Sequence, residues 1–515
     1  MKRKNIQTKE VVIKPKEEYA YGYIIKALAG GLYPNKFHVI REYIQNAFDA
    51  IVSWKATSKD KNVEIRTAIQ KPSIFIFDNG IGMDRHTLNE YRKVGFSKKV
   101  VGESVGFRGI GKLSGISVAK KLIVTTSPYG INEKYTLTFD AEAMIKEIDE
   151  LKKKRANIPL NTLIEKHTSL TSSPEAKDKH YTMVELHSIK PDSKILFDKK
   201  RLVDYISKNT PVPFDPKFEQ RKEIEEDIKT FVTDYDCVNI SVDGKNIYKP
   251  FSPNLKKFQH ILVNDQRNLK KLLAYCWYCE NEKKGQIEPI EESGLVYRYK
   301  NFTVGDNYLT RTTVWNTASH LAFYFIGEIY IIDQSILPTS QRDNFEQSVA
   351  RDRFYKEANK IAVELNKIAY DSSGIRRAED YVKKGVEVIS NIKNDVKKRE
   401  PSLKDLGAQK IAKLVNIIDN IEKRKKNIPQ TDKKTKFLAE NVVKQAKKLL
   451  KEVERVEKTE GEEFNIVKKL KLDKQGERVY STVIRTLKDF FVDKPEELER
   501  IIKILHRNLL DVFFN

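Results

Sequence analysis

The sequence predicts an α/β protein in which two α/β domains precede a helical region. Three observations predict this class. Residues 17–215 alternate strand-like and helix-like segments and hold most of the glycine-rich turns. Residues 216–350 mix acidic helical segments with apolar strands, and from residue 351 long helical patterns run almost without glycine. We therefore expect domains at 1–215, 216–350 and 351–515, and we place the first connector at the proline-rich segment Pro211–Pro216.

The composition narrows the class of protein. Hydrophobic residues make up 40% of the 515 positions and aromatic residues 10%, which is enough to build a core and argues against global disorder. Charged residues reach 32%, and no uncharged run approaches the ~18 residues that a membrane span needs. The basic start Met1–Asn5 is not followed by an apolar signal core. We expect a protein of the cytoplasm with no membrane partner.

Charge and cysteine content suggest partners and compartment. Lys and Arg number 95 against 72 Asp and Glu, so the net charge of +23 favours polyanionic partners such as nucleotides or nucleic acid. Only three cysteines are present, which excludes a disulfide framework and fits a reducing compartment. We expect Cys276 and Cys279 to be packed core residues rather than zinc ligands or a redox pair.

Alternating hydrophobicity marks the strands of the first two domains. In the first domain they are Val63–Ile69, Ser73–Phe77, Lys121–Thr126, Tyr135–Phe139 and Thr182–His187. In the second domain we expect strands at Leu295–Tyr299 and Ala322–Ile332. The polar stretch Lys152–Lys179 is interpreted as an inserted surface segment.

The third region is basic and helical. Residues 381–460 hold 22 Lys and Arg against 12 Asp and Glu, a net charge of +10. An apolar row at helical spacing indicates a packing face, either within a bundle of this chain or in a dimer contact: Val442, Ala446, Leu449, Val453 and Val456. The last helix is expected to begin at Asp493, with Pro495 just inside it.

Three short motifs carry the candidate chemistry. In the predicted helix Phe37–Ile51, the side chains of Glu42, Asn46 and Asp49 fall within about 60° of one another, opposite an apolar face. Such a row can polarise water and hold a hard cation, although a solvated polar face has the same pattern. An apolar strand then runs into the second motif, Asp78-Asn79-Gly80-Ile81-Gly82, where the carboxylate can accept a hydrogen bond from an exocyclic amine.

The third motif is a glycine loop, Gly106-Phe107-Arg108-Gly109-Ile110-Gly111-Lys112, which is predicted to lead into an apolar helix and to cradle phosphate. It is not a Walker loop, because Leu113 occupies the Ser/Thr position that binds magnesium. The polar, glycine-containing segment Arg85–Val105 before it is typical of a closing lid.

Together, and in this order, the motifs resemble the GHKL ATPase superfamily, which includes gyrase-type topoisomerase subunits, ninety-kilodalton heat-shock chaperones, histidine kinases and MutL proteins. The resemblance covers about residues 20–215 and implies a Bergerat-type α/β sandwich, a mixed sheet with helices on one face, followed by a transducer-like α/β domain. It implies ATP and Mg²⁺ as ligands. Glu42 would activate water, Asn46 would bind magnesium, and Asp49 would lie at the nucleotide. Asp78 would recognise adenine, with Gly80, Gly82, Met83 and Thr182 around the base. The phosphates would be wrapped by Gly106, Phe107, Arg108, Gly109, Ile110, Gly111 and Lys112.

A further segment, Leu337–Glu346, is similar to the middle-domain loop of the ninety-kilodalton chaperones, with Gln341 as one extra residue in the register. By that resemblance Arg342 would reach the γ-phosphate as an arginine finger. A surface arginine paired with Asp343 or Glu346 is the simpler alternative.

The leading hypothesis is an ATP-driven clamp of the chaperone, MutL or MORC type. It would form a homodimer on ATP binding, with Met1–Glu18 as an exchanged strap, and act on DNA or a protein client. The alternatives are a nucleic-acid-binding protein whose ATP site regulates occupancy and a topoisomerase B-like subunit. A histidine kinase is disfavoured, because the one histidine before Glu42, His38, lies on the same predicted helix.

Overall fold

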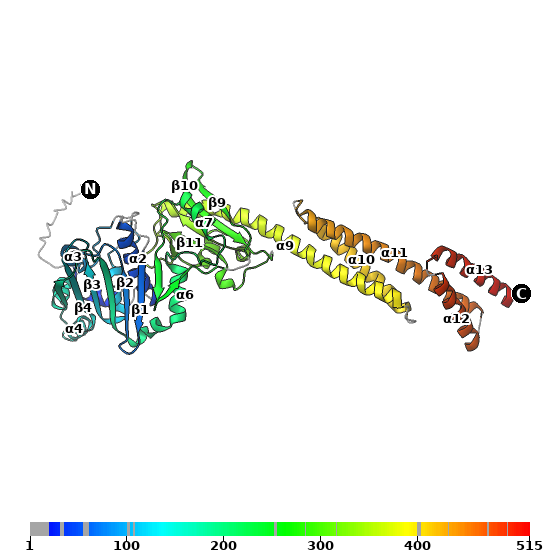
Figure 1. Ribbon diagram of the computed structural model, residues 1–515, viewed down its shortest axis with the longest axis horizontal. Helices are drawn as coiled ribbons and strands as arrows, with labels where there is room; N and C mark the ends of the chain where they lie inside the picture. Colours follow the sequence, from blue (N-terminus) through cyan, green and yellow to red (C-terminus); the bar gives the residue numbers. More distant parts are fainter. Residues whose placement is uncertain are drawn as a thin grey trace, which may run out of the picture. The chain divides into compact units, whose positions relative to one another are not determined.

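The computed structural model describes most of the chain, as two compact units, Met1–Asn366 and Lys367–Asn515 (Figure 1). The described residues are 20–30, 35–54, 61–99, 104–106, 109–251, 255–283, 285–315, 317–398, 403–430, 432–470, 473–491 and 493–514. The expected strap Met1–Glu18 and two residues of the glycine loop, Phe107 and Arg108, lie outside them.

The first unit contains an eight-stranded sheet with the strand order β5-β4-β3-β6-β2-β1-β7-β8. Only β1 and β7 pair in parallel; all other neighbours are antiparallel. The strands are β1 (Asn62–Ala68), β2 (Ser73–Asp78), β3 (Ala119–Ser127), β4 (Glu133–Asp140), β5 (Thr168–Pro174), β6 (Tyr181–Ile189), β7 (Asn239–Val242) and β8 (Lys245–Ile247). The five strands predicted for the first domain are confirmed within one to two residues at each end.

Helices cover one face of this sheet. They are α1 (Tyr23–Gly30), α2 (Phe37–Ser53), α3 (Arg85–Tyr91), α4 (Ala141–Lys153), α5 (Leu160–Lys166) and α6 (Lys199–Asn209), with the 3₁₀ helices η1 (Gly111–Ser117) and η2 (Pro191–Phe197). Alternate strand residues such as Ile76, Val124 and Val184 are buried on that face, where α2 packs against β2 and α4 against β3. The predicted sandwich, a mixed sheet with helices on one face, is confirmed.

Two local predictions were wrong. The segment Lys152–Lys179 is not an insertion, because it forms α5 and the edge strand β5. The strand was missed because an edge strand pairs through its backbone, here with β4, and needs few apolar side chains. The apolar helix expected after the glycine loop is only the short η1. It ends at Ser117, because β3 already begins at Ala119 and leaves no room for a longer helix.

A five-stranded sheet completes the first unit, with the order β12-β11-β13-β10-β9. Its strands are β9 (Gln259–Asp265), β10 (Asn268–Glu280), β11 (Gly294–Tyr299), β12 (Phe302–Val304) and β13 (Phe325–Ile331), accompanied by α7 (Arg221–Phe231), η3 (Ile290–Glu292), α8 (Asn307–Thr313) and η4 (Ser319–Tyr324). The second predicted strand therefore starts later than expected, because Ser319–Tyr324 is helical. The boundary predicted at residue 215 falls inside this unit, since β7 and β8 join the first sheet. The division at 215 and 350 stays a prediction.

The two neighbouring cysteines lie in β10. Cys276 and Cys279 are free, fully buried thiols, and residues three apart on a strand point to opposite faces. Burial raises the pKa of both thiols, that of Cys279 to about 12. Their positions support the interpretation as packed core residues.

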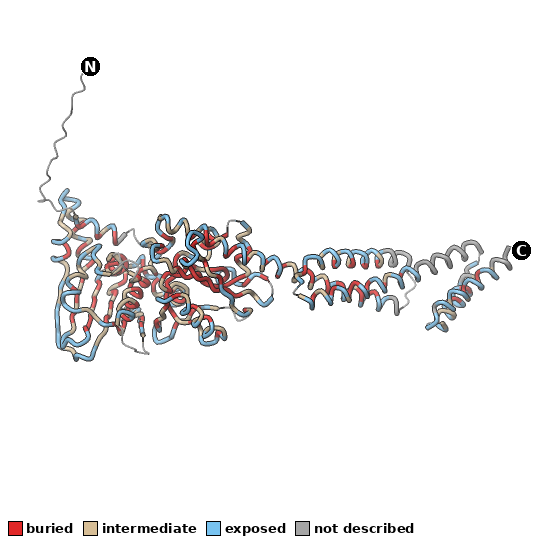
Figure 2. The backbone as a smooth tube through the Cα atoms, turned by 90° about the horizontal axis from the view of Figure 1, so that it is seen from above, coloured by how far each residue is buried: buried red, intermediate tan, exposed pale blue. Residues whose placement is uncertain are grey.

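The second unit is helical, as the sequence predicts. It contains the end of α9 (Val349–Lys398), then α10 (Leu403–Lys425), α11 (Lys433–Leu470), α12 (Lys474–Phe490) and α13 (Pro495–Phe514). Four members of the apolar row, Val442, Ala446, Leu449 and Val453, pack with buried residues of α9 and α10, so the row belongs to an intramolecular bundle (Figure 2). The Val456 side chain lies outside the description. No helix in the described ranges is both long and apolar enough to cross a lipid bilayer.

Candidate active site

The three motifs meet in one cavity of about 400 Å³, within the ~300–1,000 Å³ typical of small-molecule sites. Its walls are α2, the ends of β2 and β6, the lid and the glycine loop. The predicted site residues that line it are Glu42, Asn46, Asp49, Asp78, Gly82, Met83, Gly106, Gly109, Ile110, Gly111, Lys112, Thr182 and Arg342. Gly80 does not line it but bends the turn beside it.

Asp78 and Thr182 line the cavity and belong to a row of polar side chains across three strands. Asp78 on β2 pairs in register with Thr182 on β6, which pairs with Thr126 on β3. The three continue the buried face of the sheet, and the two threonine hydroxyls lie 3.1 Å apart. Burial raises the pKa of Asp78 to about 7, against the backbone hydrogen bonds of Gly80 and Thr182, which lower it. The carboxylate is thus a desolvated acceptor at a strand end.

The glycines of the second motif are needed for close packing. A Cβ atom on Gly80 would lie 2.7 Å from that of Ala50 on α2. Gly82 has a φ of +75°, and a Cβ atom there would lie 2.1 Å from the Ser127 carbonyl oxygen. The turn therefore fits between α2 and β3 only without side chains, and the Met83 N–H donates to the Thr126 hydroxyl at 2.9 Å.

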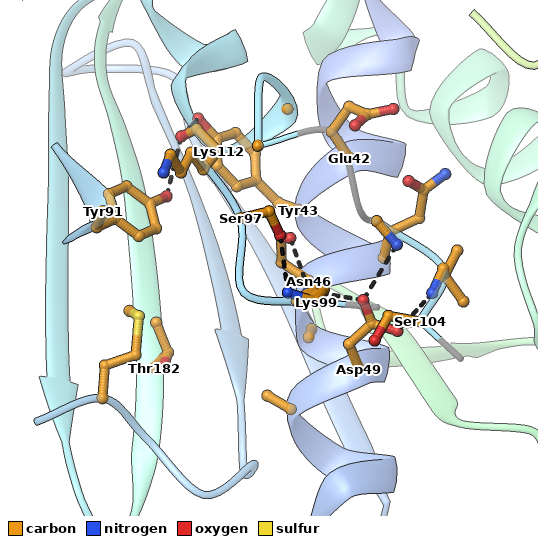
Figure 3. Close-up of a pocket in the computed structure, with 18 of the residues that line it drawn as sticks. Glu42, Tyr43, Asn46, Asp49, Tyr91, Ser97, Lys99, Ser104, Lys112 and Thr182 are labelled. Atoms are coloured by element: carbon orange, nitrogen blue, oxygen red, sulfur yellow. Dashed lines mark hydrogen bonds and ion pairs between the residues drawn. The ribbon is translucent and has the colours of Figure 1, made fainter. Parts of the chain in front are cut away.

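Glu42, Asn46 and Asp49 project from one side of α2, as the spacing predicts (Figure 3). Asp49 accepts hydrogen bonds from the backbone N–H groups of Val105 (3.0 Å) and Gly106 (3.1 Å), and so anchors the start of the glycine loop. The Lys99 ammonium of the lid lies 2.6 Å from the Asp49 carboxylate and 3.4 Å from the Asn46 amide oxygen. A cation already lies against these two oxygens, so the pair fits a hard metal ion completed by phosphate and water.

The glycine loop passes close to Glu42 and to the lid. A Cβ atom on Gly111 would lie 2.1 Å from a Glu42 carboxylate oxygen, and one on Gly109 (φ +69°) 2.4 Å from the Phe96 carbonyl oxygen. The Lys112 ammonium donates to the carbonyls of Glu90 (3.1 Å) and Phe96 (2.9 Å), and burial lowers its pKa to about 8. The predicted phosphate ligand Lys112 thus holds the base of the lid in this structure.

Arg342 reaches the same cavity from the loop after β13. The residue has a φ of +55°, its side chain is 6% exposed, and one guanidinium nitrogen, Nη2, donates to the Val105 carbonyl at 2.7 Å. The other, Nη1, is buried and has no hydrogen-bond partner in the described part of the chain. Burial, followed by the charge of Arg41, lowers the pKa of Arg342 to about 10. The surface-arginine alternative is therefore wrong, because the side chain is buried in the site.

Three residues of this region received no role from the sequence: Arg41, Gln45 and Lys99. Arg41 is 2% exposed and donates to the Gln341 carbonyl at 2.8 Å, next to Arg342. Gln45 is also 2% exposed and lines the cavity. Helical spacing places Gln45 next to Glu42, three residues before it, and Asp49, four residues after it, and this spacing could have indicated it. No local pattern indicates the contacts of Arg41 or Lys99.

The mixed sheet covered by helices on one face, with a strand-end aspartate, an acidic helix and a glycine loop around one cavity, defines an ATPase domain of the GHKL superfamily. Residues 35–173 match a family described as histidine kinase-, DNA gyrase B-, and HSP90-like ATPase. The chain therefore contains a domain of this superfamily.

Three relatives are bacterial chaperone proteins HtpG. The chain is 32% identical to that of Rickettsia typhi over 150 residues, 25% of this chain and 24% of the relative. It is 27% identical to that of Sulfurovum sp. over 210 residues, which are 36% of this chain and 30% of the relative. It is also 27% identical to that of Helicobacter pylori strain HPAG1 over 192 residues, 32% of this chain and 29% of the relative. The similarity thus spans less than a third of each relative's length.

Proposed function

We propose that this protein is a magnesium-dependent ATPase in which ATP binding closes the lid. One observation carries the proposal: a single cavity is lined by the acidic row of α2, the buried Asp78, the glycine loop and Arg342, although Arg342 lies far along the chain. The orphaned Nη1 of Arg342 is a buried cationic donor, which favours an anionic ligand.

Each end of the cavity has its own chemistry. At the Asp78 end, the buried carboxylate accepts a hydrogen bond from the adenine amine, and Thr182 and Met83 pack around the base. At the Glu42 end, the carboxylate orients and deprotonates the attacking water. Arg342 and the backbone of the glycine loop stabilise the charge that develops on the transferred phosphoryl group. Asp49 holds that loop in place through Val105 and Gly106.

Asn46, with Asp49 beside it, would hold Mg²⁺ from the α2 side. The ion would supply charge neutralisation on the phosphate oxygens. Lys99 now makes the contacts that the ion would take over, so Lys99 leaves these oxygens when the metal and nucleotide enter.

The contacts of Val105 support coupling between ATP binding and movement of the second sheet. Its N–H is bound by Asp49 of α2 and its carbonyl by Arg342, which follows β13. Closing the phosphate loop therefore pulls on a segment outside the ATPase sheet. We propose that this movement closes a homodimeric clamp on a macromolecular client, in the manner of a chaperone. The alternatives remain a nucleic-acid client and a topoisomerase B-like role. The nucleic-acid alternative draws on the basic run 423–426, in which Arg424 stacks on Tyr381 and Lys425 forms an ion pair with Glu440.

Turnover and mass test the proposal together. We expect ATP hydrolysis that requires Mg²⁺ and stops with excess chelator, because the ion neutralises the phosphates during transfer. We also expect the mass in solution to double with a non-hydrolysable ATP analogue, measured by light scattering. Absence of nucleotide binding would refute the ATPase, an unchanged mass would refute the dimeric clamp, and turnover stimulated by DNA would favour the nucleic-acid client.

Replacing Arg342 by lysine tests whether this residue of the predicted second domain contributes to ATP hydrolysis. Arg342→Lys keeps the positive charge but cannot bind Val105 and a phosphate oxygen with two nitrogens at once. We expect kcat to fall about 30- to 100-fold, while the affinity for ADP changes less than threefold. Arg66→Lys, at a side chain that is 68% exposed, is the matched control and should leave kcat unchanged. Full turnover in Arg342→Lys would remove the arginine from the mechanism.

A further inference from the structure

Gln45 lies among the residues of the acidic row on α2, and its terminal amide is incompletely satisfied. The residue is 2% exposed, it lines the cavity, and its Nε2 atom is buried with no hydrogen-bond partner among the residues that the structure describes. A buried donor without an acceptor carries a free-energy penalty, so native proteins tolerate few of them and usually for a functional reason.

Two neighbouring donors share this condition. Within the described residues, the Nε atom of Arg41, one helical turn before Gln45, and the Nη1 atom of Arg342 are also buried without hydrogen-bond partners. Arg41 donates to the Gln341 carbonyl and so holds the loop that carries Arg342, while Gln45 and Arg342 themselves line the cavity. The unpaired groups of Gln45 and Arg342 are N–H donors, and Arg342 carries positive charge. Such a pair of donors is suited to an anion rather than to a neutral or cationic group.

The position along α2 indicates which anion. The turn after Asp78 packs at Ala50, whereas the glycine loop packs at Glu42, about 12 Å away along the helix axis. Gln45 lies between them and directly beside Asn46, on the Glu42 half of the helix. In Figure 3, Glu42 and Thr182 lie at opposite ends of the cavity. A nucleotide with its base at Asp78 and Thr182 therefore directs its last phosphate toward Glu42, Gln45 and Arg342.

We infer that Gln45 is a substrate-binding residue that donates a hydrogen bond to the terminal phosphate of the nucleotide and distinguishes a triphosphate from a diphosphate. This inference rests on the proposed ATPase function and adds a specificity residue to it. The Nε2 donor would act together with the guanidinium of Arg342, which lines the same cavity. Glu42 remains available to orient and deprotonate the attacking water.

Nucleotide affinities test this role without turnover. We expect calorimetry to show that Gln45→Met weakens a non-hydrolysable ATP analogue about tenfold while ADP affinity changes less than twofold. Gln45→Glu, nearly identical in shape but without donors and with a negative charge facing phosphate, should weaken the analogue about a hundredfold and ADP much less. Gln70→Met, at an exposed position, is the control and should change neither affinity.

A merely structural role for Gln45 would change both affinities together. Equal losses for ADP and the analogue, or no loss in Gln45→Glu, would overturn the inference, and Gln45→Glu keeps the test valid if Gln45→Met does not fold. Wild-type protein that binds neither nucleotide would instead refute the proposed ATPase, and the inference with it. If the wild type binds both nucleotides and the ratio of the ADP affinity to the analogue affinity is unchanged in both variants, only the role of Gln45 is refuted.

Discussion

Glu42→Ala is expected to bind ATP with an affinity within threefold of wild type and to hydrolyse it about a thousandfold more slowly. A positioned general base contributes about 10²–10⁴ to a rate, and no other carboxylate of the acidic row can take over. Asp49 is already bound by the backbone N–H groups of Val105 and Gly106. Binding should survive, because the base and the phosphates are held by other residues.

Single-turnover hydrolysis and equilibrium binding on the same protein measure the two quantities separately. Glu142→Ala is the matched control, since that carboxylate lies on α4, is 58% exposed and forms an ion pair with Lys120. It should leave both quantities unchanged. Turnover retained in Glu42→Ala would remove Glu42 as the general base, whereas loss of binding would mean that it shapes the pocket instead.

Asp78→Asn is expected to lose ATP and ADP affinity by at least a hundredfold. The asparagine side chain has the same shape, but its NH₂ group would face the adenine amine as one donor against another, and a buried site rejects such a mismatch strongly. The carboxylate also accepts the Gly80 N–H at 2.9 Å, and the amide oxygen of asparagine can keep this contact. Asp192→Asn, at a side chain that is 65% exposed, is the control. Unaltered affinity in Asp78→Asn would place the base elsewhere.

The same residue predicts a pH dependence of binding. Burial raises the pKa of Asp78 from 3.8 to about 7 in the nucleotide-free protein, and the ionised carboxylate accepts a stronger hydrogen bond from the adenine amine than the protonated acid does. Affinity should therefore rise as the pH increases through 7 and level off above it. Below 7 it should fall by up to tenfold per pH unit in wild type. Asp78→Asn should show no such slope between pH 5.5 and 8, and an equal slope in both proteins would assign the titration to another group.

The cavity illustrates how much the sequence could predict. Alternating hydrophobicity located β2 and β6, and the turn Asp78–Gly82 had to lie at a strand end, because glycines and a carboxylate follow an apolar run directly. Helical periodicity likewise placed Glu42, Asn46 and Asp49 on one side of α2. These are local rules, in which the backbone repeat itself decides which side chains share a face.

Other features had no local signal. The edge strand β5 is polar, and the chain after the glycine loop forms only the short 3₁₀ helix η1 before β3 begins. Gly115 in that helix lies against Tyr43 and Leu186, which are distant in sequence. The hydrogen bond from Arg342 to the Val105 carbonyl joins residues 237 positions apart, and the one from Arg41 to the Gln341 carbonyl joins residues 300 positions apart. Contacts at such separation depend on how whole elements pack.

The amino-acid sequence by itself determined the fold class, the approximate bounds of β1, β2, β3, β4, β6 and β11, and which short motifs bear the chemistry, since periodicity and turn composition are properties of neighbouring residues. Only the tertiary structure decided that the motifs share one cavity with Arg342. It also decided that Lys99 lies against the oxygens of Asn46 and Asp49, and that Gln45 and Arg342 bury donors there that lack a partner among the described residues. Burial and the absence of a partner arise only when separate elements exclude water from the same volume, which is why no stretch of sequence could reveal them.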